Sequence, residues 1–316
     1  MGHLRAILLI MTAWALGCEP ASAFGTVGFA GQHHEHQRIT RLALRSFGLA
    51  PRTLDALAGT DKTFGAVGGP DNPLHGLVFT KAAHCDSGDY LAVEGYPRSA
   101  QTAQSQLEAC RTWIFDHLQA AITAVDGLDQ TGQGATANAC GTQGLAAAPA
   151  KCKVLQELGM ALHAAQDFYA HSNWVDRVPP GRDPVHNPPG LGHEGAAAWL
   201  DPAAPGTPFP AGLMTGCWDG IPTVFFCGTL SKHPRVSHDT LNKDTGLIDL
   251  GTGRVSQGET PRGSENHNFE RAVDAAILDS RGKWTVFEVS VTARYGRIRG
   301  GRLLCLLKSD TPAQCR

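Results

Sequence analysis

The stretch Leu158-Gly-Met-Ala-Leu-His-Ala-Ala-Gln-Asp-Phe-Tyr-Ala-His-Ser-Asn-Trp174 sets His163, Asp167 and His171 four residues apart within an apolar, helix-like pattern. Each step of four along an α-helix advances the azimuth by only about 40°, so the three side chains project from one stripe over about two turns. A helix presents metal ligands in this way, but polar stripes are also common on solvated helix faces. The stretch therefore predicts a helix that carries either a metal site or a solvent-facing stripe.

Apolar residues recur at helical spacing through much of the remaining chain. The spacing predicts a helix that Gly48 ends, a long helix over 99–125, a helix over 153–174, and two more over 266–280 and 283–295. Residues 178–210 are rich in Pro and Gly, which predicts a long loop or lid. Apolar and polar residues alternate over 286–291, as in a β-strand, although the flanking residues favour a helix. With no internal repeat and no convincing strand ladder, the predicted fold class is mainly α.

The chain has 316 residues, of which 42% are hydrophobic and 18% are charged, as expected for one large globular domain or two small ones. A formal charge of -2 gives no overall attraction to nucleic acid or to an anionic membrane. A local cluster of arginines near the C-terminus is interpreted as a solvated face; it comprises Arg294, Arg297, Arg299 and Arg302.

Residues 1–23 have the pattern of a secretory signal peptide, with Arg5 before an apolar run and Ala21-Ser-Ala23 as a cleavage site. Cleavage there would make Phe24 the first mature residue and leave 24–316 as a single domain, secreted or periplasmic. Lipoprotein processing at Cys18 is the alternative, but Ala15 stands where leucine is expected. No later run approaches the roughly 18 apolar residues of a spanning helix.

Eight cysteines remain after residue 23, an even number that predicts disulfides in an oxidising compartment. Their order favours pairing between neighbours: Cys140 with Cys152, Cys217 with Cys227, and Cys305 with Cys315. Zinc-thiolate sites are the weaker alternative, because no Cys-x-x-Cys pair occurs.

Further histidines and aspartates accompany the opening motif, and together they suit zinc, which binds nitrogen and oxygen ligands. They are His33, His34, His36, Asp71, His75, His84, Asp86, His238 and His267. Neither zincin signature is complete, because Arg38 and Ala197 stand where the second histidine of each His-Glu motif is required.

Several of these residues follow a recognisable order. His36 lies twelve residues after Phe24 in His-Gln-Arg-Ile-Thr, Asp71 and His84 have twelve residues between them, and His163-x3-Asp167 follows. This set resembles the zinc-dependent phospholipase C / P1-nuclease superfamily. The sequence motif at residues 162–174, with Leu241-Asn-Lys-Asp-Thr downstream, more closely resembles the Het-C-like branch of this superfamily. The resemblance covers most of residues 24–280.

The resemblance implies a mainly α-helical domain with long Pro/Gly-rich loops, disulfides and up to three zinc ions. It assigns ligands to each ion. The first ion would be held by Asp71, His84, His163 and Asp167. Asp167 would bridge to a second ion, which His36 and the amino group and carbonyl of Phe24 would bind. His171 would begin a third site, with His238 and His267 as later ligands and His193 as an alternative to them.

Three features depart from the family pattern. Phe24 stands where these enzymes usually begin with Trp, and the spacing from Asp167 to His171 is shorter than in their central helix. The third site normally ends in His-x3-Glu or His-x3-Asp, but here Asn242 and Arg271 occupy the fourth position after His238 and His267. The third site is therefore the least defined.

Each ligand also has a structural alternative. Asp71 lies in Gly-Gly-Pro-Asp-Asn-Pro, where a turn would explain it without a metal. His84 could cap its loop, and His33 and His34 could extend a flexible segment. His75, Asp86 and His117 are interpreted as structural.

The chemistry implied is phosphoester hydrolysis by zinc-activated water, since clustered zinc lowers the pKa of bound water to about 7. Asp71 is the predicted catalytic residue, orienting or deprotonating that water. Because only 7% of residues are aromatic and the net charge is small, a phospholipid or other phosphodiester substrate is favoured over nucleic acid. Peripheral membrane contact could involve Trp199 and Trp218, for which a buried core position is the alternative. The competing functions are a Het-C-like metal-binding interaction module without turnover and a P1-like nuclease.

Overall fold

The computed structural model describes residues 24–28, 31–129, 140, 149–219, 227–228 and 230–315. These residues are mainly helical, as predicted. Their β-pairing is limited to four isolated bridges, between Thr60 and Thr63, Ser172 and Thr215, Cys217 and Ser237, and Ile248 and Val255. The predicted signal peptide lies outside the described residues.

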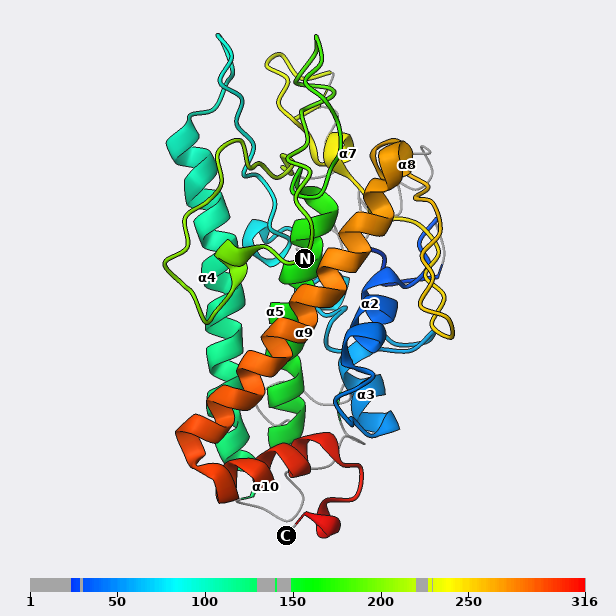
Figure 1. Ribbon diagram of the computed structural model, residues 1–316, viewed down its shortest axis with the longest axis vertical. Helices are drawn as coiled ribbons and strands as arrows, with labels where there is room; N and C mark the ends of the chain where they lie inside the picture. The colour runs from blue at the N-terminus through cyan, green and yellow to red at the C-terminus, as the bar shows by residue number, and fades with distance from the viewer. Residues whose placement is uncertain are drawn as a thin grey trace, which may run out of the picture.

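Three long helices form the centre of the molecule (Figure 1). They are α4 (Ala100–Ala124), α5 (Ala150–His171) and α9 (Asn268–Tyr295). Helices α4 and α5 pack side by side and α9 crosses them at a tilt, while α10 (Arg297–Lys308) lies across their lower end. Helices α2 (Glu35–Leu44) and α3 (Pro51–Ala58) pack on α5 and α9 away from α4.

Short helices lie in the connecting segments. The α-helical turns are α7 (His238–Leu241) and α8 (Pro261–Ser264). The 3₁₀ turns are η1 (Pro73–His75), η2 (Lys81–Ala83), η3 (Val125–Leu128), η5 (Ala198–Leu200), η6 (Glu265–His267) and η7 (Pro312–Gln314). Of these only η5 lies within 178–210, so the predicted long loop is confirmed.

Helix α5 is buried on nearly every side, because other helices surround it. His163, Asp167 and His171 are all fully buried, which excludes the solvent-facing stripe considered from the sequence. A helix that is buried all round normally carries apolar side chains. The three polar residues of α5 therefore need partners inside the protein.

The predicted break between residues 280 and 283 is wrong, because α9 continues through it. Ser280, Lys283 and Trp284 are buried there, and Gly282 lies on the exposed side, where its φ is compatible with the helix. Packing of this face outweighs the weak helix propensity of one glycine. The helical alternative for 286–291 is confirmed.

Helices α3 and α10 are additions to the sequence prediction. The arginine cluster near the C-terminus begins on α9 and continues along α10. Arg299 pairs with Asp126 and Asp129 at 2.9 and 3.1 Å, so this arginine connects α10 to η3.

The described cysteines form four disulfides. The three predicted neighbour pairs, Cys140–Cys152, Cys217–Cys227 and Cys305–Cys315, are confirmed. The fourth joins Cys85, directly after His84, to Cys110 on α4.

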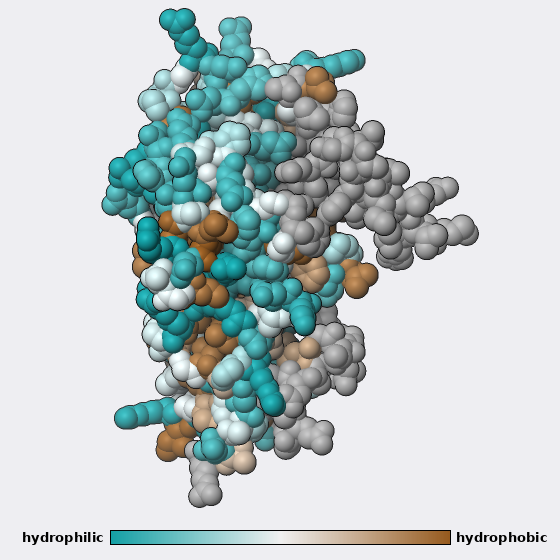
Figure 2. Space-filling view, turned by 90° about the vertical axis from the view of Figure 1, so that its right-hand side faces the viewer, coloured by the Kyte–Doolittle hydropathy of each residue, from teal (hydrophilic) through white to brown (hydrophobic). Residues whose placement is uncertain are grey.

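No helix among the described residues is long and apolar enough to cross a membrane. Trp199 and Trp218 are both buried, in agreement with the core position considered for them. The face that carries α2 and α3 is mostly hydrophilic, with apolar side chains gathered at mid-height (Figure 2).

Candidate metal centre

Five polar side chains from four segments meet beside α5, and together they are called the first cluster. Helix α2 contributes His36, the segment before η1 contributes Asp71, the residue after η2 is His84, and α5 contributes His163 and Asp167. All five were predicted as metal ligands from the sequence. The structure thus brings together residues up to 131 positions apart, since His36 and Asp167 are in contact.

Asp167 is the centre of the first cluster. Its Oδ1 lies 2.9 Å from His36 Nε2, and its Oδ2 lies 2.9 Å from both His84 Nδ1 and His163 Nε2. The carboxylate of Asp167 therefore contacts three imidazole nitrogens, with Oδ1 facing His36 and Oδ2 facing His84 and His163.

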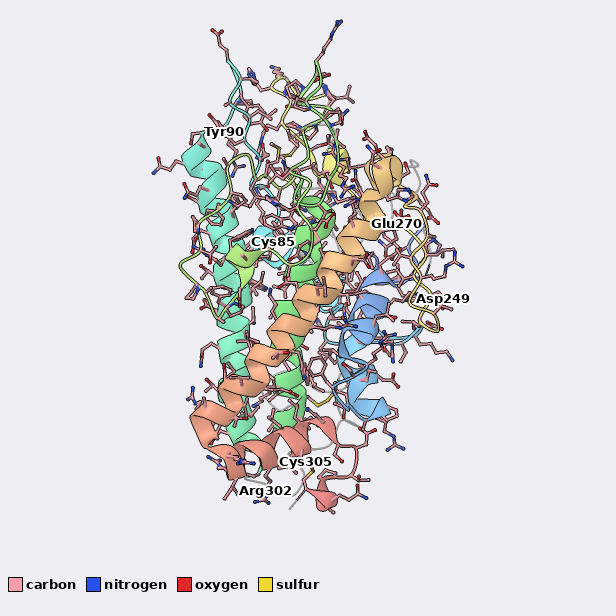
Figure 3. All side chains as sticks on the ribbon, viewed as in Figure 1. Cys85, Tyr90, Asp249, Glu270, Arg302 and Cys305 are labelled. Atoms are coloured by element: carbon pink, nitrogen blue, oxygen red, sulfur yellow. A yellow bond between two sulfur atoms is a disulfide. The ribbon has the colours of Figure 1, made fainter. Side chains whose placement is uncertain are left out.

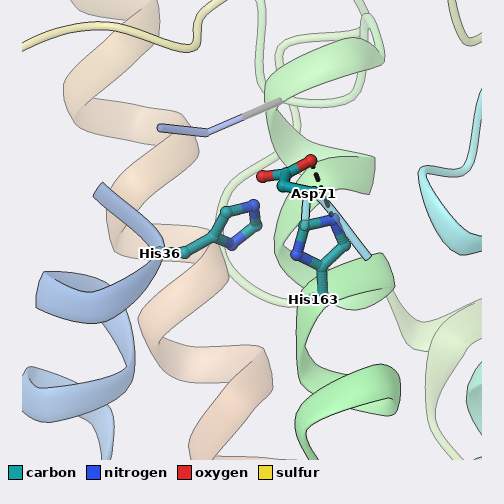
Figure 4. A group of neighbouring side chains, drawn as sticks. All are labelled: His36, Asp71 and His163. Carbon is teal, nitrogen blue, oxygen red and sulfur yellow. Dashed lines mark ion pairs between the residues drawn. The ribbon is translucent and has the colours of Figure 1, made fainter. Parts of the chain in front are cut away.

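Asp71 completes a four-sided arrangement. Its Oδ1 lies 3.8 Å from both His84 Nδ1 and His163 Nε2, as Figure 4 shows for His163. The two imidazole nitrogens are 3.1 Å apart. Four ligands about 2.0–2.2 Å from a tetrahedral ion would be separated by about 3.3–3.6 Å. The distances of 2.9–3.8 Å in the cluster are close to that spacing.

The outer nitrogens of two imidazoles show where their protons lie. His163 Nδ1 is 2.8 Å from Val67 O, and a carbonyl can only accept, so Nδ1 carries the proton and Nε2 has a free lone pair. His36 Nδ1 is 2.8 Å from Gln166 Oε1. The amide of Gln166 is itself oriented by donating to Thr40 and Ser280, which leaves Oε1 to accept. Hydrogen bonds of this kind orient metal-binding histidines.

Two of the inner atoms lack hydrogen-bond partners. His36 Nε2 and Asp167 Oδ1 are buried and 2.9 Å apart, yet neither makes a hydrogen bond of acceptable geometry. In the neutral tautomer that Gln166 favours, a nitrogen lone pair faces a carboxylate oxygen. Such a pair is repulsive unless a metal cation, or a proton on His36, lies between the two atoms. This is the main sign that the residues present fit a metal ion.

Burial and charge act on the pKa values of the cluster in opposite directions. Burial would raise the pKa of Asp167, but the charges of His163 and His36 hold it well below its usual range. Burial lowers the pKa of His163 and so favours the neutral imidazole that a metal requires. Burial would likewise lower the pKa of His36, but Asp167 raises it.

A second cluster lies near the C-terminal end of α5 and contains Asp86, His171, His238 and Asp244. Asp86 Oδ1 is 3.2 Å from the Nδ1 atoms of both imidazoles. Asp244 lies on the other side, 3.3 Å from the Nε2 atoms of both. All four residues are buried.

The second cluster can be satisfied in two ways. Two imidazolium rings and two carboxylates would balance in charge, and the pKa values agree with this. Burial and His171 would lower the pKa of His238, but Asp86 and Asp244 raise it to about 9. Burial would raise the pKa of Asp86, but His171 and His238 lower it to about 2. Alternatively a metal could lie beside His171 Nε2 and Asp244 Oδ1, which are buried and unpartnered, while His171 Nδ1 donates to His84 O at 3.0 Å.

Two other predicted ligands, His267 and His193, lie apart from both clusters, whereas Phe24 lies beside the first. The His267 side chain is 77% exposed and pairs with Glu270, and His193 is exposed and packs on Trp174. Phe24 is buried with its ring 5.9 Å from that of His36. Ligation by its amino group would need cleavage before it, in a segment that lies outside the described residues.

Sequence reasoning missed two members of the second cluster. Asp86 was interpreted as structural, and Asp244 was noted only within the motif 241–245. A signal existed for both, because Asp86 is two residues from His84 and Asp244 is six residues from His238. A further group, Cys217, Asp219 and Cys227, is no thiolate site, because its cysteines form a disulfide.

Comparisons with known proteins give no match, whether to family models, to curated protein sequences or to solved structures. The surface beside the clusters adds little about a ligand. A hollow of about 280 Å³ lies against α2, but its lining includes Arg38, Arg41 and Thr60 and none of the cluster residues.

Proposed function

We propose that this chain is a secreted or periplasmic zinc-dependent phosphoester hydrolase, most similar in mechanism to phospholipase C. The observation that carries the proposal is the first cluster, where imidazole nitrogens and carboxylate oxygens converge and two inner atoms, His36 Nε2 and Asp167 Oδ1, lack hydrogen-bond partners. Mixed nitrogen and oxygen ligands at this spacing favour zinc over magnesium or calcium, which prefer oxygen ligands alone.

Zinc held there would lower the pKa of a bound water to about 7 and offset the charge that develops on a phosphoester. Asp71 is the residue proposed to orient or deprotonate that water. Its side chain is 16% exposed, whereas His84 is 6% exposed and the other three members are fully buried. Asp71 is thus the member that a substrate can reach.

The proposed substrate is a phospholipid. Near-neutral charge and few aromatic residues give little support for a groove that binds single-stranded nucleic acid. The four disulfides fit a secreted or periplasmic protein, because such bonds persist in oxidising compartments.

Burial of the first cluster favours a second candidate function. His36, His163 and Asp167 are inaccessible to solvent, so an ion there could hold α2, α5 and the 71–84 segment together without turning over substrate. This corresponds to a Het-C-like interaction module that keeps metal for stability.

Elemental analysis of protein purified without added metal tests both candidates at once. The hydrolase is expected to contain zinc and to cleave phosphatidylcholine vesicles, with activity lost on chelation and restored by zinc. Asp71→Asn should lower this activity by about 10²–10⁴ while the helical content is retained. Asp116→Asn on the exposed side of α4 is the matched control and should have no effect.

Bound zinc with no hydrolysis of phospholipid or single-stranded DNA, from mildly acidic to mildly alkaline pH, would support the second candidate and exclude the first. Hydrolysis of DNA alone would replace the phospholipase by a nuclease. Protein that neither contains nor takes up metal would overturn both candidates.

A further inference from the structure

A three-residue connector, His84-Cys85-Asp86, joins the two clusters. His84 Nδ1 lies 2.9 Å from Asp167 Oδ2 in the first cluster, and Asp86 Oδ1 lies 3.2 Å from His171 Nδ1 in the second. The His84 carbonyl also accepts from His171 Nδ1 at 3.0 Å. Because Cys85 alone separates the two acting side chains, a change in its backbone would move both.

The backbone of the connector is strained. Cys85 has φ of 54° and Ser87 has φ of 66°, in the left-handed region that residues with a Cβ rarely adopt. Such conformations persist where the surrounding structure imposes them, and they concentrate at functional sites. The turn at Cys85 directs His84 and Asp86 to different clusters.

Covalent and packing contacts hold this backbone in place. Cys85 is bonded to Cys110 of α4, with 4.8 Å between the Cα atoms, and both residues are buried. Cys85 Sγ also lies 3.1 Å from Ala164 O, next to His163 on α5. Figure 3 shows Cys85 between α4 and α5. On the other side, Ser87 N donates to Gly216 O at 2.6 Å.

We propose that the Cys85–Cys110 disulfide is a positioning element of the metal centre, which holds Cys85 in its left-handed conformation and thereby keeps His84 in the first cluster and Asp86 in the second. The inference rests on the proposed metal site. It goes beyond that site by making one disulfide responsible for the order of both clusters.

The test compares Cys85→Ala/Cys110→Ala with Cys305→Ala/Cys315→Ala. The second pair removes a disulfide on α10, at the far end of the molecule from Cys85 (Figure 3). Zinc affinity is measured by competition with a chelator, and zinc per chain by elemental analysis. Loss of a group that orients a metal ligand weakens affinity by about 10–100-fold, so that is the decrease expected for the first pair. The second pair should keep the affinity of the unmodified chain.

Cys85→Gly/Cys110→Ala tests the backbone part of the proposal. Glycine adopts positive φ without a steric penalty, so this variant should recover part of the affinity that the alanine pair loses. Equal loss in the glycine and alanine forms would refute the idea that the bond holds the left-handed backbone. Affinity unchanged in the alanine pair would overturn the positioning role altogether.

A readout that does not depend on metal separates this inference from the proposed function. Hydrogen exchange of the 81–88 segment should accelerate when Cys85–Cys110 is broken and stay slow when Cys305–Cys315 is broken. If the unmodified chain binds no zinc, the proposed function fails, and the exchange result still decides the positioning role. If the alanine pair does not fold, Cys85→Ser/Cys110→Ser, whose side chains are closer in size to cysteine, replaces it, and no local acceleration would count against the proposal.

Discussion

Gln166 shows how a residue outside the first cluster can define its geometry. It lies one position before Asp167 on α5, is fully buried, and accepts from His36 Nδ1 while donating to Thr40 and Ser280. This network fixes which nitrogen of His36 faces Asp167. The orientation of His36 therefore depends on α2, α5 and α9 together.

Gln166→Leu should weaken zinc binding by about 10–100-fold, because His36 would lose the acceptor that fixes its tautomer. Leucine is similar in size, so the helical content should be unchanged. Gln104→Leu on the exposed face of α4 is the control. Zinc affinity measured against a chelator checks the prediction, and equal affinities in the two variants would show that Gln166 has no such role.

Protonation of the second cluster should shape the stability of the metal-free protein. Asp86 has a pKa lowered to about 2 from 3.8, so its contribution is present above pH 3.8 and is lost as the pH falls through 2. His238 has a pKa raised to about 9 from 6.5, so its contribution is present below pH 6.5 and is lost as the pH rises through 9. The cluster should stabilise the fold most between these limits.

Denaturant unfolding of chelated protein at several pH values measures this dependence. Between pH 6.5 and 9 the unmodified chain should lose on the order of 1–3 kcal/mol more than His238→Asn does. Parallel curves for the two proteins in that range would mean that His238 is not a protonated partner of Asp86.

The site residues that the sequence predicts are those whose spacing carries information. His163 and Asp167 share a helix face, and His36, Asp71 and His84 were predicted from their order along the chain. Asp86 could not be placed in the same way, because its direction depends on the positive φ of Cys85, which the local sequence does not specify. Asp244 depends equally on where a loop from the distant end of the chain packs.

At the scale of elements, α5 owes its central position to a small residue. A Cβ at Gly159 would lie 2.3 Å from the carbonyl carbon of Ala66, so only glycine allows α5 to approach this segment closely. The next residue, Val67, supplies the carbonyl that accepts from His163 Nδ1. Close packing of helix and loop thus sets the tautomer of His163, a candidate metal ligand.

Gly159→Ala should destabilise the fold by about 1–3 kcal/mol through overpacking, and it should weaken zinc binding by displacing Val67. The matched control is Gly282→Ala in α9, where a Cβ would meet nothing within 4 Å. There the better helix propensity of alanine should stabilise the fold by about 0.5–1 kcal/mol. Denaturant unfolding of both variants checks the opposite signs, and a neutral Gly159→Ala would contradict the close approach.

The helices show which parts of an element the sequence specifies. Periodicity locates α4 well, since its apolar residues repeat regularly and Ser99 caps its first turn. It fails at residues 280–283, because the continuity of α9 comes from packing of Ser280 and Trp284 in the core. Helix α10 was not predicted, although the interpretation of its arginines as a solvated face is confirmed, because Arg297, Arg299 and Arg302 are all exposed.

At the scale of the whole molecule, the first cluster adds ion pairs between segments that packing and a few hydrogen bonds also join. It joins α2, α5 and His84, the residue after η2, around one buried carboxylate. Without a cation, the unpartnered atoms of His36 and Asp167 face each other in a region closed to water. Metal bound to the folded chain and not to the unfolded chain therefore stabilises the fold by mass action.

Removing the metal should lower the melting temperature. Free metal at a hundred times its dissociation constant contributes about 2.7 kcal/mol, and for a chain of this size each kcal/mol corresponds to about 1.5 °C. The expected decrease on chelation is thus about 4 °C, measured by circular dichroism with the disulfides kept intact. Asp167→Asn provides the control, because it removes the carboxylate that both sides of the cluster share and should melt at one temperature with or without chelator. If chelation lowers the melting temperature of Asp167→Asn as much as that of the unmodified chain, the stabilising metal lies elsewhere. If chelation lowers neither melting temperature, protons rather than a metal neutralise the buried lone pairs of the first cluster, as they can in the second cluster.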